Sequence, residues 1–422
     1  MTSPQVSHRA RLMPASPIRK LMPLAEEARR RGIRVYHLNI GQPDLETPPA
    51  MRERLGKLTD RTYAYTPSGG TPEYLASLQE YYRRLGIPLA LNELIATTGG
   101  SEAALFSFFA CANQGDDVLV VEPFYTNYNS FAAMAGVRLV PLTSKGEDGF
   151  HLPPRQDWEK TLTPRTRLVI LCNPNNPTGT VYSREEVVRV AEFCRDHGLF
   201  LVMDEVYREF VYDGRHCESG LTLSGFEQQI IVVDSLSKRY SACGIRLGAL
   251  ATRNREVHEA CLRMAQGRLS PPGLAQFVAV GAAQLGPDYF AGVVAEYQKR
   301  RDLLYEGLCK IPGVFLARPE GAFYFVARLP VDDGDEFAKW MLTEFSHEGG
   351  TVMVAPASGF YATPGRGKNE ARIAYVLKCE DLAASVRILA AGLEAYGEAK
   401  RPVGAPAAET VADPDFASPN GA

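Results

Sequence analysis

The segment IIVVDSLSKRYSACGIRLG, residues 230–248, joins an apolar run to a lysine that lies among small side chains. Its first four residues are β-branched and apolar, which is typical of a short strand buried on both faces. Lys238 then follows among serine, alanine, cysteine and glycine, where the chain looks too crowded for an ordinary solvated charge. Arg246 stands eight positions later, directly before Leu-Gly. The segment therefore predicts a buried strand and raises the question of what the Lys238 amine does.

Similar apolar runs occur on both sides of this segment and alternate with helical patterns. We expect strands at 116–122, 137–142, 167–172, 199–205, 229–235 and 246–252. A helix is expected from about Ser183 to His197, and Ser183 with Glu186 has the pattern of a capping box at its start. Strands this apolar are covered by helices on both faces. The sequence thus predicts an α/β fold with a three-layer large domain and a mostly parallel sheet.

The two ends of the chain differ from this central part. Residues 1 to about 45 look irregular and rich in Arg and Pro, and beyond a long helix that opens at Glu296 the pattern turns to α+β. We predict an N-terminal arm and part of a small domain at 1–48, a large domain at 49–295, and a small C-terminal domain at 296–398. The smaller α+β domain is thus formed by both chain ends. Residues 399–422 have the composition of a disordered tail.

Composition and charge argue against several classes of function. The chain has 422 residues, a net charge of -3 and no long Lys/Arg run, so we expect no nucleic-acid partner. No apolar stretch approaches the roughly 20 residues that span a bilayer, and the N-terminus lacks the apolar core of a secretion signal. The eight cysteines include no C-x-x-C pair. This pattern predicts reduced thiols in a cytoplasmic protein, with no membrane partner and no metal site.

Polar residues gather directly after three of the predicted strands. They are Asn173 and Asn176 after the first, Asp204, Glu205 and Tyr207 after the second, and Ser235, Ser237 and Lys238 after the third. In a parallel α/β sheet, ligands bind at the carboxyl ends of the strands. Each group alone is ordinary turn or capping chemistry, and the P-loop and G-x-G-x-x-G patterns are both missing from the sequence. Their occurrence together predicts a ligand site at this edge of the sheet.

Four motifs in this region resemble those of one enzyme family. They are CNPNNPTG at 172–179, DEVY at 204–207, SLSKRYSACGIRLG at 235–248 and ARIAYV at 371–376. In this order and at these separations, the chain resembles the class I/II aminotransferases of the aspartate aminotransferase family, which have fold type I and depend on pyridoxal 5'-phosphate. The resemblance covers roughly residues 15 to 398. It implies the fold predicted above and a homodimer with shared active sites.

The resemblance implies a role for each residue around the cofactor ring. Lys238 matches the lysine that forms a Schiff base with the cofactor, and burial and nearby cations would lower the pKa of its amine toward neutrality. Asp204 matches the acid that pairs with the pyridine nitrogen and keeps it protonated. Asn176 and Tyr207 match the groups that hydrogen-bond the 3'-oxygen. Lys238, Asp204 and Tyr207 are therefore the expected catalytic residues.

The phosphate and the outer face of the ring need further groups. The resemblance assigns them to the backbone N–H groups of Ser101 and Glu102, to Ser235, Arg246 and Tyr125, and to Tyr65 from the neighbouring subunit. A helix N-terminus and an arginine fork both suit an anion. Phe124 competes with Tyr125 for the place over the ring, and Tyr65 also fits a plain core aromatic.

Arg372, Gly41 and Asn176 match the groups that hold the substrate α-carboxylate. A planar guanidinium grips a carboxylate at two points and so fixes the orientation of Cα. Some bacterial aspartate enzymes carry a lysine where this chain has Glu102. For that reason we consider Arg268, before a Pro-Pro turn, as the reader of a side-chain carboxylate, although a solvated arginine fits as well. Four aromatic residues suggest the alternative of an aromatic substrate: Phe323, Tyr324, Phe360 and Tyr361.

The reaction implied is a ping-pong transamination between an L-amino acid, best aspartate or glutamate, and a 2-oxo acid such as 2-oxoglutarate. Two alternatives are open. An aminotransferase for aromatic or other neutral amino acids, or a pyridoxal-phosphate lyase or synthase of the same fold, would share every motif. A non-catalytic regulator that senses a ligand would need a DNA-binding module ahead of the sheet, and the roughly 45 preceding residues lack that pattern.

Overall fold

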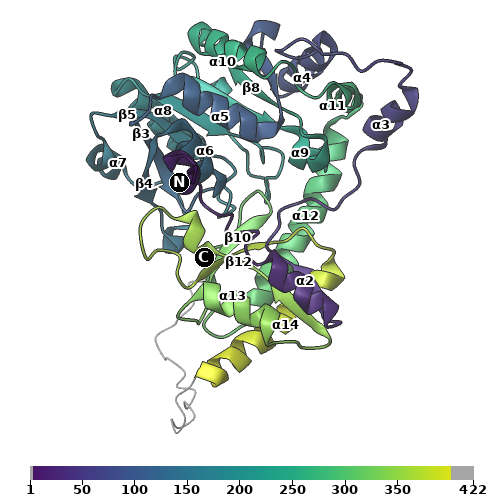
Figure 1. The fold of residues 1–422 in the computed structure, drawn as a ribbon, viewed down its shortest axis with the longest axis vertical. Coiled ribbons are helices and arrows are strands. Elements are labelled where there is room, and N and C mark those ends of the chain that lie inside the picture. The colour runs from purple at the N-terminus through teal and green to yellow at the C-terminus, as the bar shows by residue number, and fades with distance from the viewer. Residues whose placement is uncertain (1–2, 401–422) are drawn as a thin grey trace.

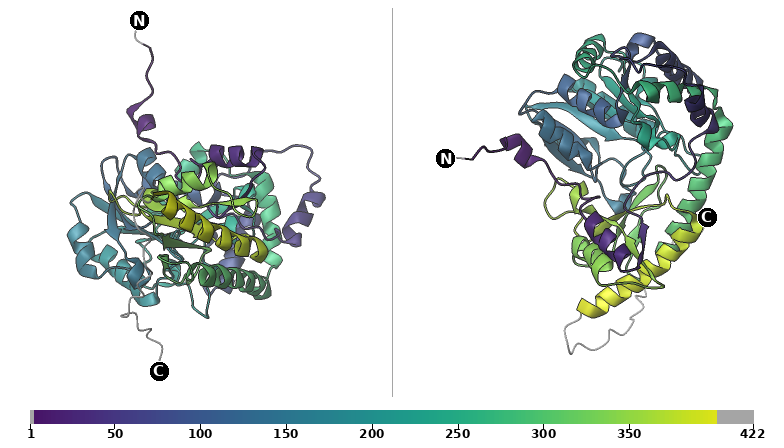
Figure 2. Two further views of the ribbon diagram at one scale, coloured as in Figure 1. Left: turned by 90° about the horizontal axis from the view of Figure 1, so that it is seen from below. Right: turned by 45° about the vertical axis from the view of Figure 1, so that its right-hand side comes forward.

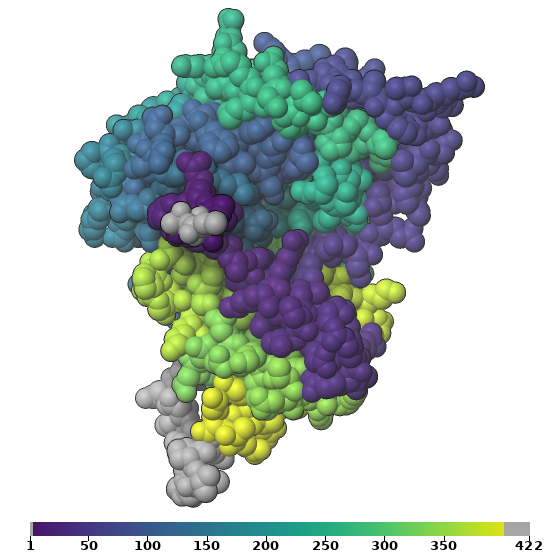
Figure 3. Space-filling model, viewed as in Figure 1, coloured from purple at the N-terminus to yellow at the C-terminus, as the bar shows by residue number. Residues whose placement is uncertain are grey.

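A computed structural model describes residues 3–400 of the chain. A large body built around one extended sheet sits above a smaller body, and the N-terminal segment runs across the junction between them (Figure 1). The space-filling view shows this segment lying on the surface where the two bodies meet (Figure 3). The fold is the predicted α/β fold with a smaller second domain, while the predicted domain boundaries stay a prediction.

The large body contains a seven-stranded sheet in the order β2-β8-β7-β6-β5-β3-β4. Five neighbouring strands run parallel, and β8 is antiparallel to both of its neighbours. The sheet is therefore mostly parallel, as predicted. Its strands are β2 (Leu94–Thr97), β3 (Asp117–Glu122), β4 (Arg138–Thr143), β5 (Thr166–Cys172), β6 (Phe200–Asp204), β7 (Ile230–Ser235) and β8 (Gly248–Thr252).

Apolar residues on both faces of the strands explain the layers. Alternate residues of a strand point to opposite faces. Along β5, Val169 and Leu171 accordingly pack in one core cluster, whereas Leu168 and Ile170 pack in another. The helices of the large body are α3 (Pro49–Arg52), α4 (Pro72–Arg84), α5 (Gly99–Cys111), α6 (Asn127–Ala135), α7 (Arg155–Thr161), α8 (Arg184–Asp196), α9 (Leu236–Arg239), α10 (Arg255–Gly267) and α11 (Gly273–Ala279). The predicted capping box of Ser183 and Glu186 does begin α8.

The smaller body joins segments from both ends of the chain. A four-stranded sheet has the order β12-β13-β10-β9, and β1 pairs in parallel with β11 in a separate two-stranded sheet. These strands are β1 (Arg34–His37), β9 (Phe315–Leu316), β10 (Tyr324–Arg328), β11 (Gly350–Met353), β12 (Ala355–Pro356) and β13 (Glu370–Ala374). The helices with them are α2 (Met22–Arg30), α13 (Gly334–Thr343) and α14 (Cys379–Lys400).

Two expectations about the chain ends were wrong. Residues 3–45 are not irregular throughout, because they contain a short exposed helix α1 (His8–Leu12), then α2 and β1. The long helix α12 (Pro287–Leu308) begins earlier than the predicted Glu296. Gly286 is its N-cap, and Pro287 is its first residue. It runs along one side of the molecule from the large body into the small one (Figure 2). The last helix ends at Lys400, and the tail predicted beyond it lies outside the described residues.

No single helix within residues 3–400 is long and apolar enough to cross a membrane. The pair Gly273–Gln284 and Pro287–Leu308 passes the same test of length and composition only when it is taken together, and it is bent by 97°.

Candidate active site

A cavity of about 630 Å³ opens at the carboxyl ends of β5, β6 and β7. Its wall includes the last residue of each of these strands, Cys172, Asp204 and Ser235. Ten of the thirteen sequence-predicted site residues line it: Gly41, Ser101, Tyr125, Asn176, Asp204, Tyr207, Ser235, Lys238, Arg246 and Arg372. The motifs that the sequence spreads over more than 300 positions are thus brought to one place.

Lys238 lies in the single-turn helix α9, which begins directly after β7. Its Nζ donates a hydrogen bond to the backbone oxygen of Gly41 at 2.8 Å and lies 3.8 Å from Cys243 Sγ. Burial lowers the pKa of this amine, and the positive charges of Arg372 and Arg246 act in the same direction. A lysine that loses its proton more readily than usual is suited to nucleophilic chemistry.

Asp204 ends β6 and is buried. Its Oδ2 accepts a hydrogen bond of 2.7 Å from the Tyr128 hydroxyl. Burial raises the pKa of this carboxyl to about 6, against the opposing effect of the Tyr128 bond. Sequence reasoning missed Tyr128; the only signal was its place three residues after Tyr125, at the start of the helix α6 that follows Tyr125.

A continuous series of hydrogen bonds connects Arg372 to the middle of the cavity. Arg372 Nη1 donates to Asn176 Oδ1 at 3.1 Å, and Asn176 Nδ2 donates to the Tyr207 hydroxyl at 3.3 Å. The Tyr207 hydroxyl in turn lies 3.0 Å from that of Tyr324. A Cβ atom on Gly41 would stand 1.7 Å from the Tyr324 hydroxyl, so the backbone there can come this close only as glycine.

The start of α5 forms a cradle together with Arg246. Gly99 has φ +73°, and a Cβ atom there would lie 2.6 Å from Arg246 Nη2. Arg246 itself has left-handed backbone angles, φ 55° and ψ 52°, which a non-glycine residue adopts at an energetic cost. The Ser235 hydroxyl also lines this part of the cavity, donating to Ser237 Oγ at 2.9 Å. A helix N-terminus, a guanidinium and hydroxyls are donors that fit a phosphate group.

The charges that line the cavity do not balance. Four cations contribute to the wall, Arg19, Lys238, Arg246 and Arg372, against the single carboxylate of Asp204. Among residues 3–400, none of these four cations has a carboxylate within ion-pair distance, although other arginines of the same protein form many such pairs. Arg372 is buried, and its Nε has no hydrogen-bond partner. Groups of this kind are suited to an anionic ligand with more than one acidic group.

Three predicted site residues lie outside the cavity wall. The Glu102 side chain turns back to accept a hydrogen bond from Thr98 N at 2.8 Å, which leaves only its backbone at the start of α5. Tyr65 is 79% exposed. Arg268 points into its own chain: its Nη2 donates to the backbone oxygens of Ser68 and Ala96, and its Nε lies 3.5 Å from Glu102 Oε1.

The aromatic residues divide between the cavity and the core. Tyr125 lines the cavity, whereas Phe124 is buried and stacks on Tyr128 at 6.3 Å between ring centroids. Of the four aromatics considered for an aromatic pocket, only Tyr324 lines the wall. Phe360 instead packs on the Arg372 guanidinium at 5.1 Å, so it supports that arginine from behind.

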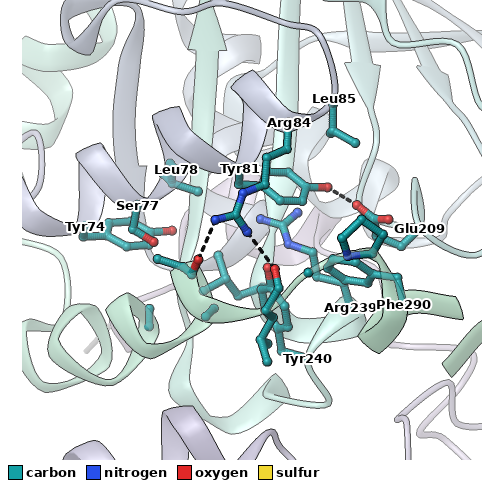
Figure 4. A pocket seen from close by; sticks show the side chains of 17 residues that line it. Tyr74, Ser77, Leu78, Tyr81, Arg84, Leu85, Glu209, Arg239, Tyr240 and Phe290 are labelled. Atoms are coloured by element: carbon teal, nitrogen blue, oxygen red, sulfur yellow. Dashed lines mark hydrogen bonds between the residues drawn. The ribbon is translucent and has the colours of Figure 1, made fainter. Parts of the chain in front are cut away.

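Figure 4 shows a second, smaller cavity of about 190 Å³, which is also lined by residues of α9. Leu236, Arg239 and Tyr240 line it, while Lys238 between them lines the first cavity. Arg84 donates to the backbone oxygens of Ala283 and Leu285, and the Tyr81 hydroxyl donates to Glu209 (Figure 4). The short helix that carries Lys238 thus separates two cavities.

The sequence and structure are similar to those of known enzymes. A sequence model described as "Aminotransferase class I and II" matches residues 33–386. A "Probable aspartate/prephenate aminotransferase" of Aquifex aeolicus is 31% identical over 399 residues, which cover 92% of this chain and 98% of the relative. The structure of the Thermus thermophilus aspartate aminotransferase with maleate is 29% identical, covering 92% of this chain and all of that one, with a TM-score of 0.83. An alanine aminotransferase of Pyrococcus furiosus, 28% identical, covers 93% of this chain and all of its own with a TM-score of 0.84.

Proposed function

The chain belongs to the class I and II aminotransferase family and is an aminotransferase, and we propose that it holds pyridoxal 5'-phosphate in the cavity around Lys238. The observation that carries this proposal is the excess of cations, four against one carboxylate, around an amine whose pKa burial lowers. Members of the family generally depend on this cofactor, and its phosphate matches the cradle at Gly99 and Arg246.

Each part of the cofactor has a group of the chain to hold it. The Lys238 amine would hold it covalently, and the start of α5, Ser235 and Arg246 would hold its phosphate. Asp204 holds the ring nitrogen in its protonated form; a cation there favours the ionised carboxylate, whose formation burial otherwise opposes. When bound, the cofactor supplies a ring system that accepts the electron pair left when a bond at the substrate Cα breaks.

The remaining work is done by the chain's own side chains. Arg372 binds the substrate α-carboxylate in two places, and Asn176 keeps the guanidinium in position through its 3.1 Å hydrogen bond. With the cofactor in place, the Lys238 amine would also be the group placed to take a proton from the substrate Cα. An amine whose pKa is lowered by burial is an efficient general base.

The substrates are an amino acid and a 2-oxo acid, used in turn. Aspartate or glutamate with 2-oxoglutarate is the proposed pair, and the names of the relatives support aspartate. The aromatic alternative has less support, because of the four candidate aromatics only Tyr324 reaches the cavity. A lyase or synthase reaction would release ammonia, which a product assay distinguishes from retained amine.

We further propose that the protein acts as a homodimer with Tyr65 reaching the neighbouring active site. Several large apolar side chains around α3 and α11 are exposed: Leu55, Tyr63, Tyr65, Leu269 and Leu274. Their segments are tied together, since Gln276 Nε2 donates to Thr66 Oγ1 at 3.0 Å. An exposed apolar patch of this kind is typical of a subunit interface. The eight free cysteines support a cytoplasmic location.

The shared site can be tested by mixing two inactive variants. Lys238→Ala and Tyr65→Ala protomers should each transfer amine poorly, while refolding them together should give hybrid dimers in which one site has both native residues. Return of activity on mixing is expected. A mixture no more active than its components would contradict the exchange of Tyr65 between subunits.

The reaction itself is tested by adding single amino acids to the purified protein with pyridoxal phosphate bound. Loss of the absorbance of the lysine-linked cofactor, with formation of the matching 2-oxo acid, is the expected result. Ammonia release without transfer to an added 2-oxo acid would contradict an aminotransferase and indicate a lyase.

A further inference from the structure

Arg19 is the one cation of the active-site cavity to which the proposed function gives no task. Arg246 suits the phosphate, Arg372 the α-carboxylate, and Lys238 the covalent link. Arg19 also lines the cavity, beside Ser16 and Ile18 of the N-terminal segment. Burial raises the pKa of the Tyr125 hydroxyl to about 12, and the positive charge of Arg19 is among the charges that oppose this rise.

The backbone around Arg19 is tied to the machinery that holds the α-carboxylate. Asn39 is fully buried; its Nδ2 donates to the Ile18 backbone oxygen at 3.0 Å, and its own backbone oxygen accepts from Arg372 Nη2 at 2.5 Å. On the other side, the backbone N–H groups of Arg19 and Lys20 both donate to Ser16 O, at 3.1 and 3.0 Å. The turn at 16–20 is therefore fixed relative to Arg372 through a single residue.

The neighbouring cation behaves differently. Lys20 forms an ion pair with Asp335, which also accepts from the Ser358 hydroxyl at 2.6 Å. Arg19 has neither an ion pair nor a side-chain hydrogen bond among the groups of residues 3–400. The two adjacent cations therefore differ. Lys20 binds the segment to the small domain through Asp335, whereas Arg19 lines the cavity and makes no side-chain hydrogen bond within residues 3–400.

Arg268, the sequence-based candidate for reading a side-chain carboxylate, is committed elsewhere. Its Nη2 donates to two backbone oxygens and its Nε lies 3.5 Å from Glu102 Oε1, while its buried Nε and Nη1 have no hydrogen-bond partner among residues 3–400. To reach another subunit's cavity, it would have to leave these partners and expose Glu102 as an uncompensated charge. Arg19 needs no such rearrangement.

We infer that Arg19 binds the second carboxylate of a dicarboxylic substrate, and thus that it selects aspartate or glutamate over amino acids with neutral side chains. This inference rests on the proposed function, since it requires an amino acid held by Arg372 in the same cavity. It assigns the specificity to the N-terminal segment of the same chain. A guanidinium matches a carboxylate with paired charge-assisted hydrogen bonds.

The test compares Arg19→Gln with the matched control Lys20→Gln, which also removes one cation from the same turn. Binding of maleate, a dicarboxylate, and of propionate, a monocarboxylate, is measured by calorimetry on the protein with cofactor bound. Arg19→Gln should weaken maleate binding by about 30-fold and change propionate binding by less than about 2-fold. Lys20→Gln should change both affinities by less than about 2-fold, because the hydrogen bond from Asn39 to the Ile18 backbone oxygen still holds the turn that carries Arg19.

A kinetic comparison completes the test. Arg19→Gln should lower kcat/KM for aspartate by about 30-fold and leave kcat/KM for alanine within about 2-fold, with Arg19→Lys in between. Unchanged maleate affinity and an unchanged aspartate-to-alanine ratio would overturn the inference, as would the same loss in Arg268→Gln with Arg19→Gln unaffected. Both results leave the aminotransferase reaction intact. Failure of the native protein to convert any amino acid would instead contradict the proposed function.

Discussion

The two cavities that flank α9 use the same kinds of side chain in opposite ways. On the Lys238 side, the open side of α9, four cations face one carboxylate, and none of the four has an ion-pair partner within the described part of the chain. On the Arg239 side, the closed side of α9, each charged side chain is held by the protein itself: Arg239 pairs with Asp234 at 2.5 Å, Arg84 with two backbone oxygens, and Glu209 with Tyr81. Among the buried side-chain atoms of the described residues around this cavity, only Arg239 Nε lacks a hydrogen-bond partner.

This difference separates the structural charges from the functional ones. A buried charge is stable only if something compensates it. Where the compensation comes from the fold, the charge positions the backbone; where the fold supplies none, a ligand must. The buried network of Arg239, Asp234, Arg208 and Glu205 therefore supports α9 from behind, and the cavity in front of α9 receives the anions.

The largest effect is expected from removing the amine on the open side. Lys238→Ala should lower the rate of amino-acid conversion by about 10⁴-fold or more, because both the covalent link and the proton carrier are lost. It should leave the free energy of unfolding of the cofactor-free protein nearly unchanged or higher, since Lys238 has no carboxylate partner. Single-turnover spectroscopy and urea unfolding measure the two effects. A variant with more than about a hundredth of native activity would contradict this role.

Removing a charge on the closed side should lower the stability of the fold more than it lowers the rate of amino-acid conversion. Arg239→Met leaves Asp234, which is fully buried, without its closest cation, and should lower the free energy of unfolding by about 3–5 kcal/mol. Adding Asp234→Asn to that variant should recover part of the loss. Urea midpoints at fixed protein concentration give both numbers. If the single variant is as stable as the native protein, the closed side is not a supporting network.

The titration of Asp204 distinguishes an empty from a filled cavity. Its pKa is raised by burial from its ordinary value near 4 to about 6, so the folded state holds a proton that the unfolded state has already lost. In the cofactor-free protein, this group should therefore cost stability as pH rises from about 4 to 6, by about 3 kcal/mol. Subtracting the same pH series for Asp204→Asn isolates the effect. With cofactor bound, the difference should vanish or reverse, and an identical slope in both proteins would contradict the assignment.

The smallest effect is expected at the edge of the closed side. Tyr81→Phe removes only the hydroxyl that donates to Glu209 and keeps the ring over the Arg239 guanidinium at 4.1 Å. A loss of about 1 kcal/mol in the free energy of unfolding is expected, with unchanged amino-acid conversion. A clear loss of conversion without loss of stability would show that the two sides of α9 are not separate.

Sequence reasoning reached the open side better than the closed one. Lys238, Asp204, Asn176 and Arg372 stand in short motifs at strand ends, where local pattern and the rule for parallel sheets point to the same edge. All four line the cavity. Motifs of this kind report a ligand because the chemistry constrains residue type and spacing together.

What the sequence did not reveal depends on contacts between distant segments. The strand β1 escaped notice because its partner β11 lies at the other end of the chain, and four residues alone carry no clear period. Arg19 stands in a turn with no motif, and only its lack of a partner in three dimensions distinguishes it from Lys20. The sequence also did not predict that Arg268 donates hydrogen bonds to the backbone oxygens of Ser68 and Ala96.

The most direct test of the charge comparison is chemical trapping at the open side. Reduction of the purified, pyridoxal-phosphate-loaded protein with borohydride, followed by peptide mass mapping, should place the pyridoxyl group on Lys238 and on no other lysine. Adduct on a different lysine, or no adduct in protein that has bound the cofactor, would contradict the assignment of this cavity as the active site.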